Sequence, residues 1–263
     1  MDKPLLNGTE CLYIHQFYAM ASPFSLHLVG TKKKYLRQVG RQMEEIVRQK
    51  EQLLSKYSPA SELWRINREA NKRPVQCSLE MFEILSKALW AFEFTQGFFD
   101  IGWERANKKK NLLTNCLRLN PKTRTVSFAG EHMKLDFGGL GKGYALDRVA
   151  EELESWGIHH FLLNGGSSSA VARGRKPSGE AWTLRYQDSK EKLALRDQAF
   201  SCSGKEDGGY SVLGPDGFST EILSTALLEM EAEQVKSFCE DLREEFHIFK
   251  TSSPSQKKPI KSF

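Results

Sequence analysis

The spacing of apolar residues along the chain predicts both helices and strands. Residues 13–18 are rich in aromatic side chains, and residues 24–29 alternate between apolar and polar positions, which indicates a β-hairpin. Residues 32–56 place apolar side chains on one helical stripe, with charged residues on the other face. A coiled coil is the alternative for this stripe. We favour a helix packed on a sheet, because the three or four heptads end at Pro59.

The rest of the pattern predicts shorter elements. Helices are expected at residues 78–94, 140–156, 220–230 and 232–244. Strands are expected at residues 117–119, 125–128, 133–137, 160–164, 182–186, 192–195, 199–203 and 246–249. Residues 210–217 are expected to form a turn. Because helices and hairpin-type strands are mixed without a βαβ rhythm, the predicted fold class is α+β, with mixed or antiparallel sheets packed with helices.

The composition is that of a folded protein with a short tail. The chain has 263 residues, of which 40% are hydrophobic, and it contains 16 Phe, 7 Tyr and 5 Trp, enough for a sizeable core. We expect one domain over residues 1–252 and a disordered basic tail over 253–263, where Ser, Pro and Lys dominate. The 5 cysteines are scattered without metal-ligand spacing, so neither a disulfide framework nor a zinc site is predicted.

Charge and hydropathy exclude two classes of partner. The net charge of +5 is spread widely, and the one compact basic cluster before the tail lies at residues 108–110. No basic stripe alternates with aromatic residues, so nucleic-acid binding is not predicted. Residues 1–8 lack the apolar stretch of a signal peptide, and no later segment is long enough to span a bilayer. We therefore expect no membrane segment and a cytoplasmic location.

The glycine-rich segment at residues 138–147 carries the clearest chemical signal. A P-loop would need Gly where Asp136 stands and Ser or Thr where Gly143 stands, and a dinucleotide fingerprint would need Gly or Ala at Leu146. What remains is a strand, a glycine turn and a helix start with Lys142 on its first turn, which suits a phosphate or pyrophosphate. The alternative is a tight helix entry with a solvated lysine, and the local sequence leaves both open.

Several segments resemble motifs of the ApbE family of FAD:protein FMN transferases, in the same order along the chain. The central one is LDFGGLGKGYALDRVA at residues 135–150, followed in register by LNGG at 163–166. Upstream lie SKYSPASELWRIN at 55–67, TQGFFD at 95–100, and YAMASPF at 18–24, where Ala-Ser replaces Gly-Thr. The resemblance covers nearly all of the chain expected to be ordered and implies an ApbE-like flavin-binding fold.

The resemblance implies a reaction and a set of residues. Members of this family bind FAD in a cleft, use Mg²⁺ on its pyrophosphate, and transfer the FMN phosphoryl group to a Ser or Thr hydroxyl of an acceptor protein, releasing AMP. By position, the implied FAD-binding residues are Met20, Tyr57, Phe99, Asp100, Lys142, Asp147, Gly165, Gly166 and Ser203. The implied catalytic residues are Lys142, Glu221 and Thr225.

The same resemblance implies a metal site with oxygen ligands. The family segment A-D-x-x-x-T corresponds to residues 220–225, so the ligands would be Glu221, Thr225 and the backbone carbonyl of Gly141. Glu221 and Thr225 are spaced i, i+4 and share one helical face. Glu reaches about one methylene further than the Asp of the family, which predicts a shifted or looser site. The alternative is that Glu221 is an acid favoured by a helix N-terminus.

Two departures from the family pattern fall in the segments that carry its chemistry. The family's Gly-Gly-Asp reads Gly-Gly-Ser here, with Ser167 in place of the carboxylate. Its Tyr-Ser-His reads Tyr210, Ser211, Val212, so the histidine is lost. We therefore keep three functions open: a Mg²⁺-dependent FMN transferase, a flavin-binding or FAD-hydrolysing relative without transfer, and a non-enzymatic protein that binds a partner through the helix at 32–56.

Overall fold

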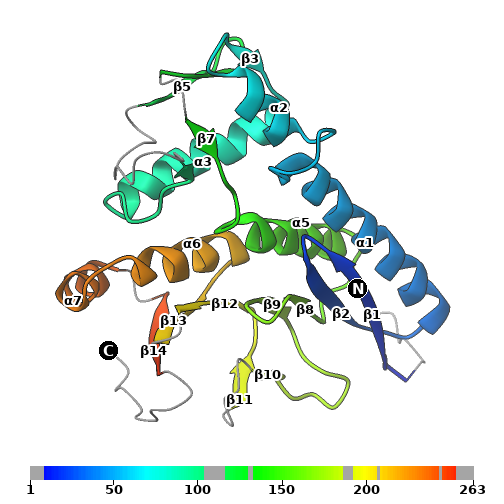
Figure 1. Ribbon diagram of the computed structural model, residues 1–263. Helices are drawn as coiled ribbons and strands as arrows, with labels where there is room; N and C mark the ends of the chain where they lie inside the picture. Colours follow the sequence, from blue (N-terminus) through cyan, green and yellow to red (C-terminus); the bar gives the residue numbers. More distant parts are fainter. Residues whose placement is uncertain are drawn as a thin grey trace.

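The chain folds into helices layered on a central antiparallel sheet (Figure 1). The computed structural model describes residues 9–103, 116–129, 133–185, 192–205, 208–242 and 245–252. The helices are α1 (Lys33–Leu54), α2 (Glu62–Glu69), α3 (Leu79–Phe94), α5 (Gly141–Ser155), α6 (Gly217–Leu228) and α7 (Ala232–Asp241). The strands are β1 (Cys11–Ala19), β2 (Ser22–Gly30), β3 (Val75–Gln76), β4 (Gly102–Trp103), β5 (Leu117–Asn120), β6 (Thr125–Phe128), β7 (Lys134–Leu135), β8 (Phe161–Gly165), β9 (Ser169–Arg173), β10 (Trp182–Arg185), β11 (Lys192–Leu195), β12 (Gln198–Lys205), β13 (Gly208–Gly214) and β14 (His247–Ser252).

The central sheet has seven strands in the order β1-β2-β8-β9-β12-β13-β14, and every neighbouring pair is antiparallel. Helices α1, α5 and α6 cover one face, and the β10–β11 hairpin lies on the other (Figure 1). Adjacent residues of β8 show the two faces, because Leu163 packs with the helices whereas Leu162 packs with Trp182 of β10. The predicted α+β class is therefore confirmed, with antiparallel sheets throughout the described residues.

Helix α1 buries the apolar stripe that its sequence predicts. Leu36, Val39, Met43 and Val47 are at most 1% exposed and pack with β2, β8 and α5 in one core cluster. Burying side chains of this size contributes about 1.5–3 kcal/mol each. The interpretation of α1 as a helix packed on a sheet is thus confirmed, and this stripe is not free to bind a partner.

Other predicted elements agree closely, and a few were missed. Helices α3 and α5 match the predicted ranges to within one residue at each end. Helix α2 was not predicted, although Ser61 accepts a hydrogen bond from Trp64 N and caps its start. Strand β9 was also missed, because its small residues carry little apolar signal. Residues 253–263, predicted to be a disordered tail, lie outside the described residues, as does the basic cluster at 108–110.

The prediction of a turn at residues 210–217 was wrong over most of its length. Residues 208–214 form β13, which pairs with β12 on one side and β14 on the other. Val212 is fully buried and packs towards α6, whereas the next residue, Leu213, packs on the opposite face of the sheet. The connection to α6 is only Pro215–Asp216, and Asp216 caps the helix by accepting from Ser219 N at 2.7 Å.

The first turns of α5 and α6 are in direct contact. A Cβ on Gly143 would lie 2.1 Å from the carbonyl oxygen of Gly217, so no side chain fits there. Asp147 of α5 accepts hydrogen bonds from Gly217 N at 2.7 Å and Phe218 N at 2.8 Å. Burial raises the pKa of this carboxyl to about 7, while the two backbone N–H donors act in the opposite direction.

None of the helices in the described ranges has the length and the apolar content needed to cross a membrane.

The close contact at Gly143 predicts a selective sensitivity to substitution. Gly143→Ala should lower the free energy of unfolding by about 2–3 kcal/mol, because the added methyl meets rigid backbone. The matched change Gly141→Ala meets only the flexible end of Met20, at 3.2 Å, and should alter stability by less than about 1 kcal/mol. Urea unfolding of both variants measures the difference, and equal effects would contradict the proposed role of the helix contact.

The raised pKa of Asp147 predicts a pH dependence of stability. A carboxyl with a pKa of about 7 in the folded state and 3.8 as its ordinary value holds its proton more tightly when folded. Its contribution to the free energy of unfolding should therefore fall as the pH rises between these values and then level off. Urea unfolding near about pH 5 and about pH 8 should show a larger loss for the wild type than for Asp147→Asn. Equal losses would contradict a raised pKa at this residue.

Candidate active site

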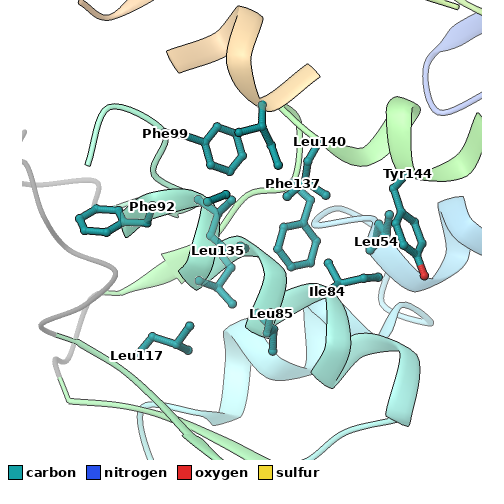
Figure 2. Packing of buried hydrophobic residues seen from close by; sticks show 14 of the residues in the cluster. Leu54, Ile84, Leu85, Phe92, Phe99, Leu117, Leu135, Phe137, Leu140 and Tyr144 are labelled. Atoms are coloured by element: carbon teal, nitrogen blue, oxygen red, sulfur yellow. The ribbon is translucent and has the colours of Figure 1, made fainter. Parts of the chain in front are cut away.

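The glycine turn before α5 is anchored in the core of the protein. Phe137 and Leu140, on either side of the turn, are 3% and 0% exposed and pack in the cluster drawn in Figure 2. Gly141 N donates to the carbonyl oxygen of Phe137 at 2.9 Å, and Gly138 N donates to Asp136 Oδ1 at 2.9 Å. The turn is therefore a fixed entry to α5, and it presents Lys142 at the start of the helix.

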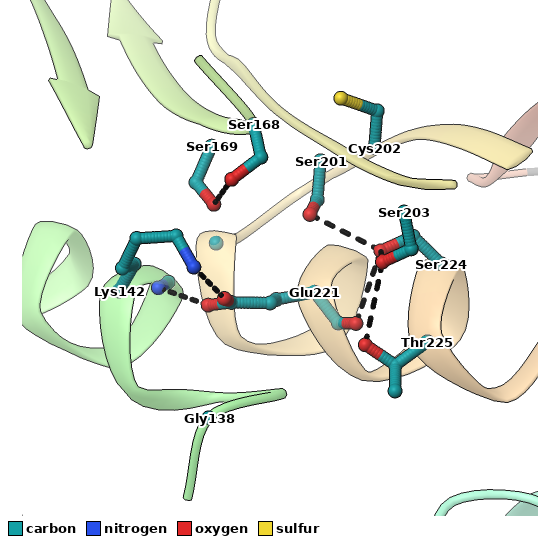
Figure 3. A network of polar contacts seen from close by, with 12 residues as sticks. Gly138, Lys142, Ser168, Ser169, Ser201, Cys202, Ser203, Glu221, Ser224 and Thr225 are labelled. Atoms are coloured by element: carbon teal, nitrogen blue, oxygen red, sulfur yellow. Dashed lines mark hydrogen bonds and ion pairs between the residues drawn. The ribbon is translucent and has the colours of Figure 1, made fainter. Parts of the chain in front are cut away.

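Lys142 and Glu221 form the central ion pair of the site (Figure 3). Lys142 Nζ lies 2.8 Å from Glu221 Oε1, and Glu221 Oε2 accepts a hydrogen bond from Gly143 N. Glu221 is 3% exposed, whereas the Lys142 side chain is 20% exposed. A carboxylate from α6 thus occupies the positive N-terminal end of α5. The alternative of an acid at a helix N-terminus takes a different form here, because Glu221 lies at the N-terminus of α5 rather than at that of its own helix.

A cluster of hydroxyl groups continues from Glu221 along α6 and β12. Ser224 Oγ lies 3.1 Å from Ser201 Oγ and 3.0 Å from Ser203 Oγ, and Ser203 Oγ lies 3.4 Å from Thr225 Oγ1 (Figure 3). Ser224 also donates to the backbone oxygen of Glu221 at 3.1 Å. The structure therefore brings the hydroxyls of the predicted residues Ser203 and Thr225 together, and Ser224 links this cluster to the backbone oxygen of Glu221. Their oxygen atoms are the donors that a hard cation prefers.

The backbone next to Thr225 belongs to Gly139 rather than Gly141. A Cβ on Gly139 would lie 3.3 Å from Thr225 Oγ1, whereas one on Gly141 would face the Met20 side chain at 3.2 Å. Gly139 was not singled out from the sequence, although it lies in the glycine turn. Among the described residues, no group of three or more His, Cys, Asp and Glu side chains is placed to hold a metal ion. Any cation here would rely on one carboxylate plus hydroxyl and backbone oxygens.

Two tight turns close the site on the side of the sheet. Met20, at the tip of the β1–β2 hairpin, donates its N–H to Glu51 Oε1 at 2.8 Å. Gly166, after β8, has a φ of 67°, which favours glycine, and a Cβ there would lie 4.0 Å from Lys142 Cδ. The neighbouring Gly165 packs under the Phe24 ring. Met20, Gly141 and Gly166 therefore all lie around the start of α5.

Tyr57 and Asp100 lie near a second ion pair at the glycine turn. Tyr57 is 80% exposed, and Lys56 Nζ lies 5.1 Å from the centre of its ring. Lys56 Nζ also lies 2.5 Å from Asp136 Oδ2, and the hydrogen bond to Asp136 raises the pKa of Lys56. Asp100 accepts from Gly102 N at 2.6 Å. The exposed Tyr57 ring beside the turn is available to stack on a planar ligand.

Two predicted residues have other surroundings. Phe99 is 2% exposed and belongs to the cluster in Figure 2, so its side chain is a core residue in this structure. Asp147 is directed at the start of α6 and lines a cavity of about 310 Å³ with Trp90, Arg148 and Arg173. The Lys142–Glu221 pair does not line that cavity.

Two larger cavities meet the site at the β8–β9 turn. One of about 570 Å³ lies between the sheet and the β10–β11 hairpin, and one of about 490 Å³ lies beside β1 and β2. Both are lined by Ser25, Asn164 and Gly166. Because Gly166 also faces Lys142, these cavities adjoin the polar site rather than enclose it.

The departures from the family pattern have clear positions. Val212, where the histidine is expected, is fully buried in β13. Ser167, in place of the carboxylate, is exposed after Gly166. The Lys56–Asp136 pair was not predicted, because the two residues are 80 positions apart in the sequence. The feature of the sequence that could have indicated this pair is the carboxylate of Asp136, just before the glycine turn.

Comparisons with known proteins find relatives that share part of this sequence. The chain is 24% identical over 190 residues to the FAD:protein FMN transferase of Chlamydia muridarum, covering 65% of this chain and 60% of that protein. It is 24% identical over 209 residues to the one of Chlamydia pneumoniae, covering 71% and 65%. The matched segment thus spans less than two thirds of these relatives' length.

Solved structures share the fold. The apo flavinyl transferase ApbE of Pseudomonas stutzeri superposes with a TM-score of 0.77 at 20% identity, covering 97% of this chain and 98% of that one. The ApbE protein of Thermotoga maritima gives a TM-score of 0.76 at 18% identity, covering 93% and 98%. The family profile described as "ApbE family" matches residues 20–210, which is more than half of the chain. This chain therefore belongs to the ApbE family.

Proposed function

We propose that the protein is an FAD:protein FMN transferase. The hydroxyl oxygen of an acceptor Ser or Thr would bond to the FMN phosphorus of FAD, the phosphoanhydride bond would break, and AMP would leave with the electron pair while the hydroxyl proton passes to solvent. The observation that carries the proposal is the Lys142–Glu221 ion pair at the start of α5, with the hydroxyl cluster that includes Thr225 one turn further along α6. The names of the Chlamydia relatives support it.

Each group has a role that follows from its position. Lys142, one-fifth exposed at the start of α5, would bind a phosphate oxygen of FAD. Tyr57 would stack on the flavin or adenine, and Gly166 would let the backbone approach the ligand. Phosphoryl transfer depends mostly on positioning and charge neutralisation, so a site without the family histidine retains the main requirements.

The donor set fits a magnesium ion. The Glu221 carboxylate, the Thr225 hydroxyl and a backbone oxygen of the glycine turn are hard oxygen ligands, and Mg²⁺ commonly completes its shell with water and substrate phosphate. The backbone of Gly139 lies next to Thr225, so Gly139 is a candidate for the backbone ligand in addition to Gly141. A bound Mg²⁺ would supply charge neutralisation on the pyrophosphate.

A second candidate is binding or hydrolysis of FAD without transfer to a protein. It is favoured by the buried Val212 and the exposed Ser167, which stand where the resemblance places a histidine and an aspartate. Transfer and hydrolysis share the site and differ in whether an acceptor hydroxyl or water attacks the FMN phosphorus, whereas binding alone leaves FAD intact.

The first prediction concerns the reaction itself. Purified protein with FAD, MgCl₂ and an acceptor carrying an exposed flavinylation threonine should release AMP and increase the acceptor mass by one FMN. Glu221→Gln should abolish both, because it removes the carboxylate that is common to the metal and Lys142. Lys236→Met, which changes an exposed lysine on α7, is the matched control and should leave AMP release unchanged.

Three outcomes of that assay are distinct. AMP with a labelled acceptor supports transfer, and AMP without labelling supports the hydrolytic alternative. Bound FAD without AMP contradicts both transfer and hydrolysis and leaves a flavin-binding protein.

The second prediction concerns the Thr225 hydroxyl. Thr225→Val keeps the shape of the side chain but removes the oxygen, so the Mg²⁺ concentration needed for half-maximal AMP release should rise about tenfold or more. Thr225→Ser keeps the oxygen and should behave nearly as the wild type. A Mg²⁺ titration of AMP release distinguishes them, and an unchanged requirement in Thr225→Val would remove Thr225 from the metal site.

A further inference from the structure

Lys142 is placed to compete with a metal ion for Glu221. Its ammonium lies 2.8 Å from Glu221 Oε1, and the other carboxylate oxygen accepts from Gly143 N. Both carboxylate oxygens of Glu221 are thus bonded to protein donors, and the side chain is only 3% exposed. A divalent cation at Oε1 would meet the positive charge of Lys142 at close range, where burial weakens screening.

The Lys142 side chain has an alternative partner within its reach once FAD is bound. It is 20% exposed, its Cδ is 4.0 Å from the Cβ position of Gly166, and it starts from the first turn of α5. An ammonium on a flexible stem binds phosphate oxygens readily as a point charge. Moving towards a pyrophosphate would leave Glu221 held by Gly143 N alone, with Oε1 free.

We propose that Lys142 blocks the carboxylate of Glu221 in the free protein, so that a divalent cation binds there well only after the pyrophosphate of FAD has drawn the ammonium away. This inference rests on the proposed function and adds an order of binding to it. Because coupling between ligands is reciprocal, the cation should in turn strengthen FAD binding. Lys142 thereby acts as a positioning residue that links nucleotide binding to metal binding.

The test measures metal binding directly, without turnover. Mn²⁺ serves as the probe, and free Mn²⁺ is counted by EPR in solutions of the purified full chain without nucleotide. Lys142→Met and Lys142→Gln should bind Mn²⁺ about tenfold or more tightly than the wild type, because each removes the competing charge. Lys142→Gln keeps a hydrogen-bond donor for Glu221, which protects the fold if Lys142→Met is unstable. Lys236→Met, on the exposed face of α7, is the matched control and should bind as the wild type does.

The gain in Mn²⁺ affinity of the Lys142 variants should require the Glu221 carboxylate. The double variant Glu221→Gln, Lys142→Gln should therefore lose this gain. Equal Mn²⁺ affinity in the wild type and the Lys142 variants would overturn the inference, as would tight binding that survives Glu221→Gln or no Mn²⁺ binding by any variant. FAD binding, followed by flavin fluorescence on the same samples, separates the two proposals. Failure to bind FAD would sink the proposed function, whereas FAD binding with unchanged Mn²⁺ affinities would sink only this inference.

Discussion

The contact between the first turns of α5 and α6 is the constraint on which the site depends. Two helix N-termini in contact bring two partial positive charges together, which is unfavourable unless anions lie nearby. Each helix supplies the anion for the other: Asp147 of α5 accepts from Gly217 N and Phe218 N, and Glu221 of α6 accepts from Gly143 N. The absence of a side chain at Gly143 permits this approach.

Because the two helices exchange carboxylates, fewer backbone N–H groups of the glycine motif are free to bind a phosphate. A strand, a glycine turn and a helix start commonly offer free N–H groups to a phosphate. Here Gly141 N donates to Phe137 and Gly143 N to Glu221, so part of the helix start is already satisfied within the protein. Lys142 is left as the cationic group of the motif that reaches the surface. Under the proposed function, a nucleotide would therefore bind Lys142, and its binding would be coupled to the ion pair of Lys142 with Glu221.

The two departures from the family pattern differ in how deeply the changed residue is buried. Val212 is built into the core of the sheet, and a histidine there would be surrounded by α6 and the neighbouring strands. Ser167 lies on the exposed turn beside Gly166, where a residue can change without disturbing the packing. The hydroxyl cluster of Ser201, Ser203, Ser224 and Thr225 lies on the same side of the sheet as Glu221. The polar centre of the site is therefore formed by side chains of α6 and β12 together with Lys142 of α5.

The sequence by itself determined the local elements and the chemistry available to them. Helical periodicity identified α1 and its buried face, and the glycine turn located the start of α5. The order of motifs determined the family. Only the tertiary structure decided which groups meet: Glu221 and Gly143 are 78 residues apart, and β13 is a strand because β12 and β14 both pair with it. Periodicity records which face of an element is buried, but it holds no information on which distant donor a carboxylate will find, since that depends on the packing of whole elements.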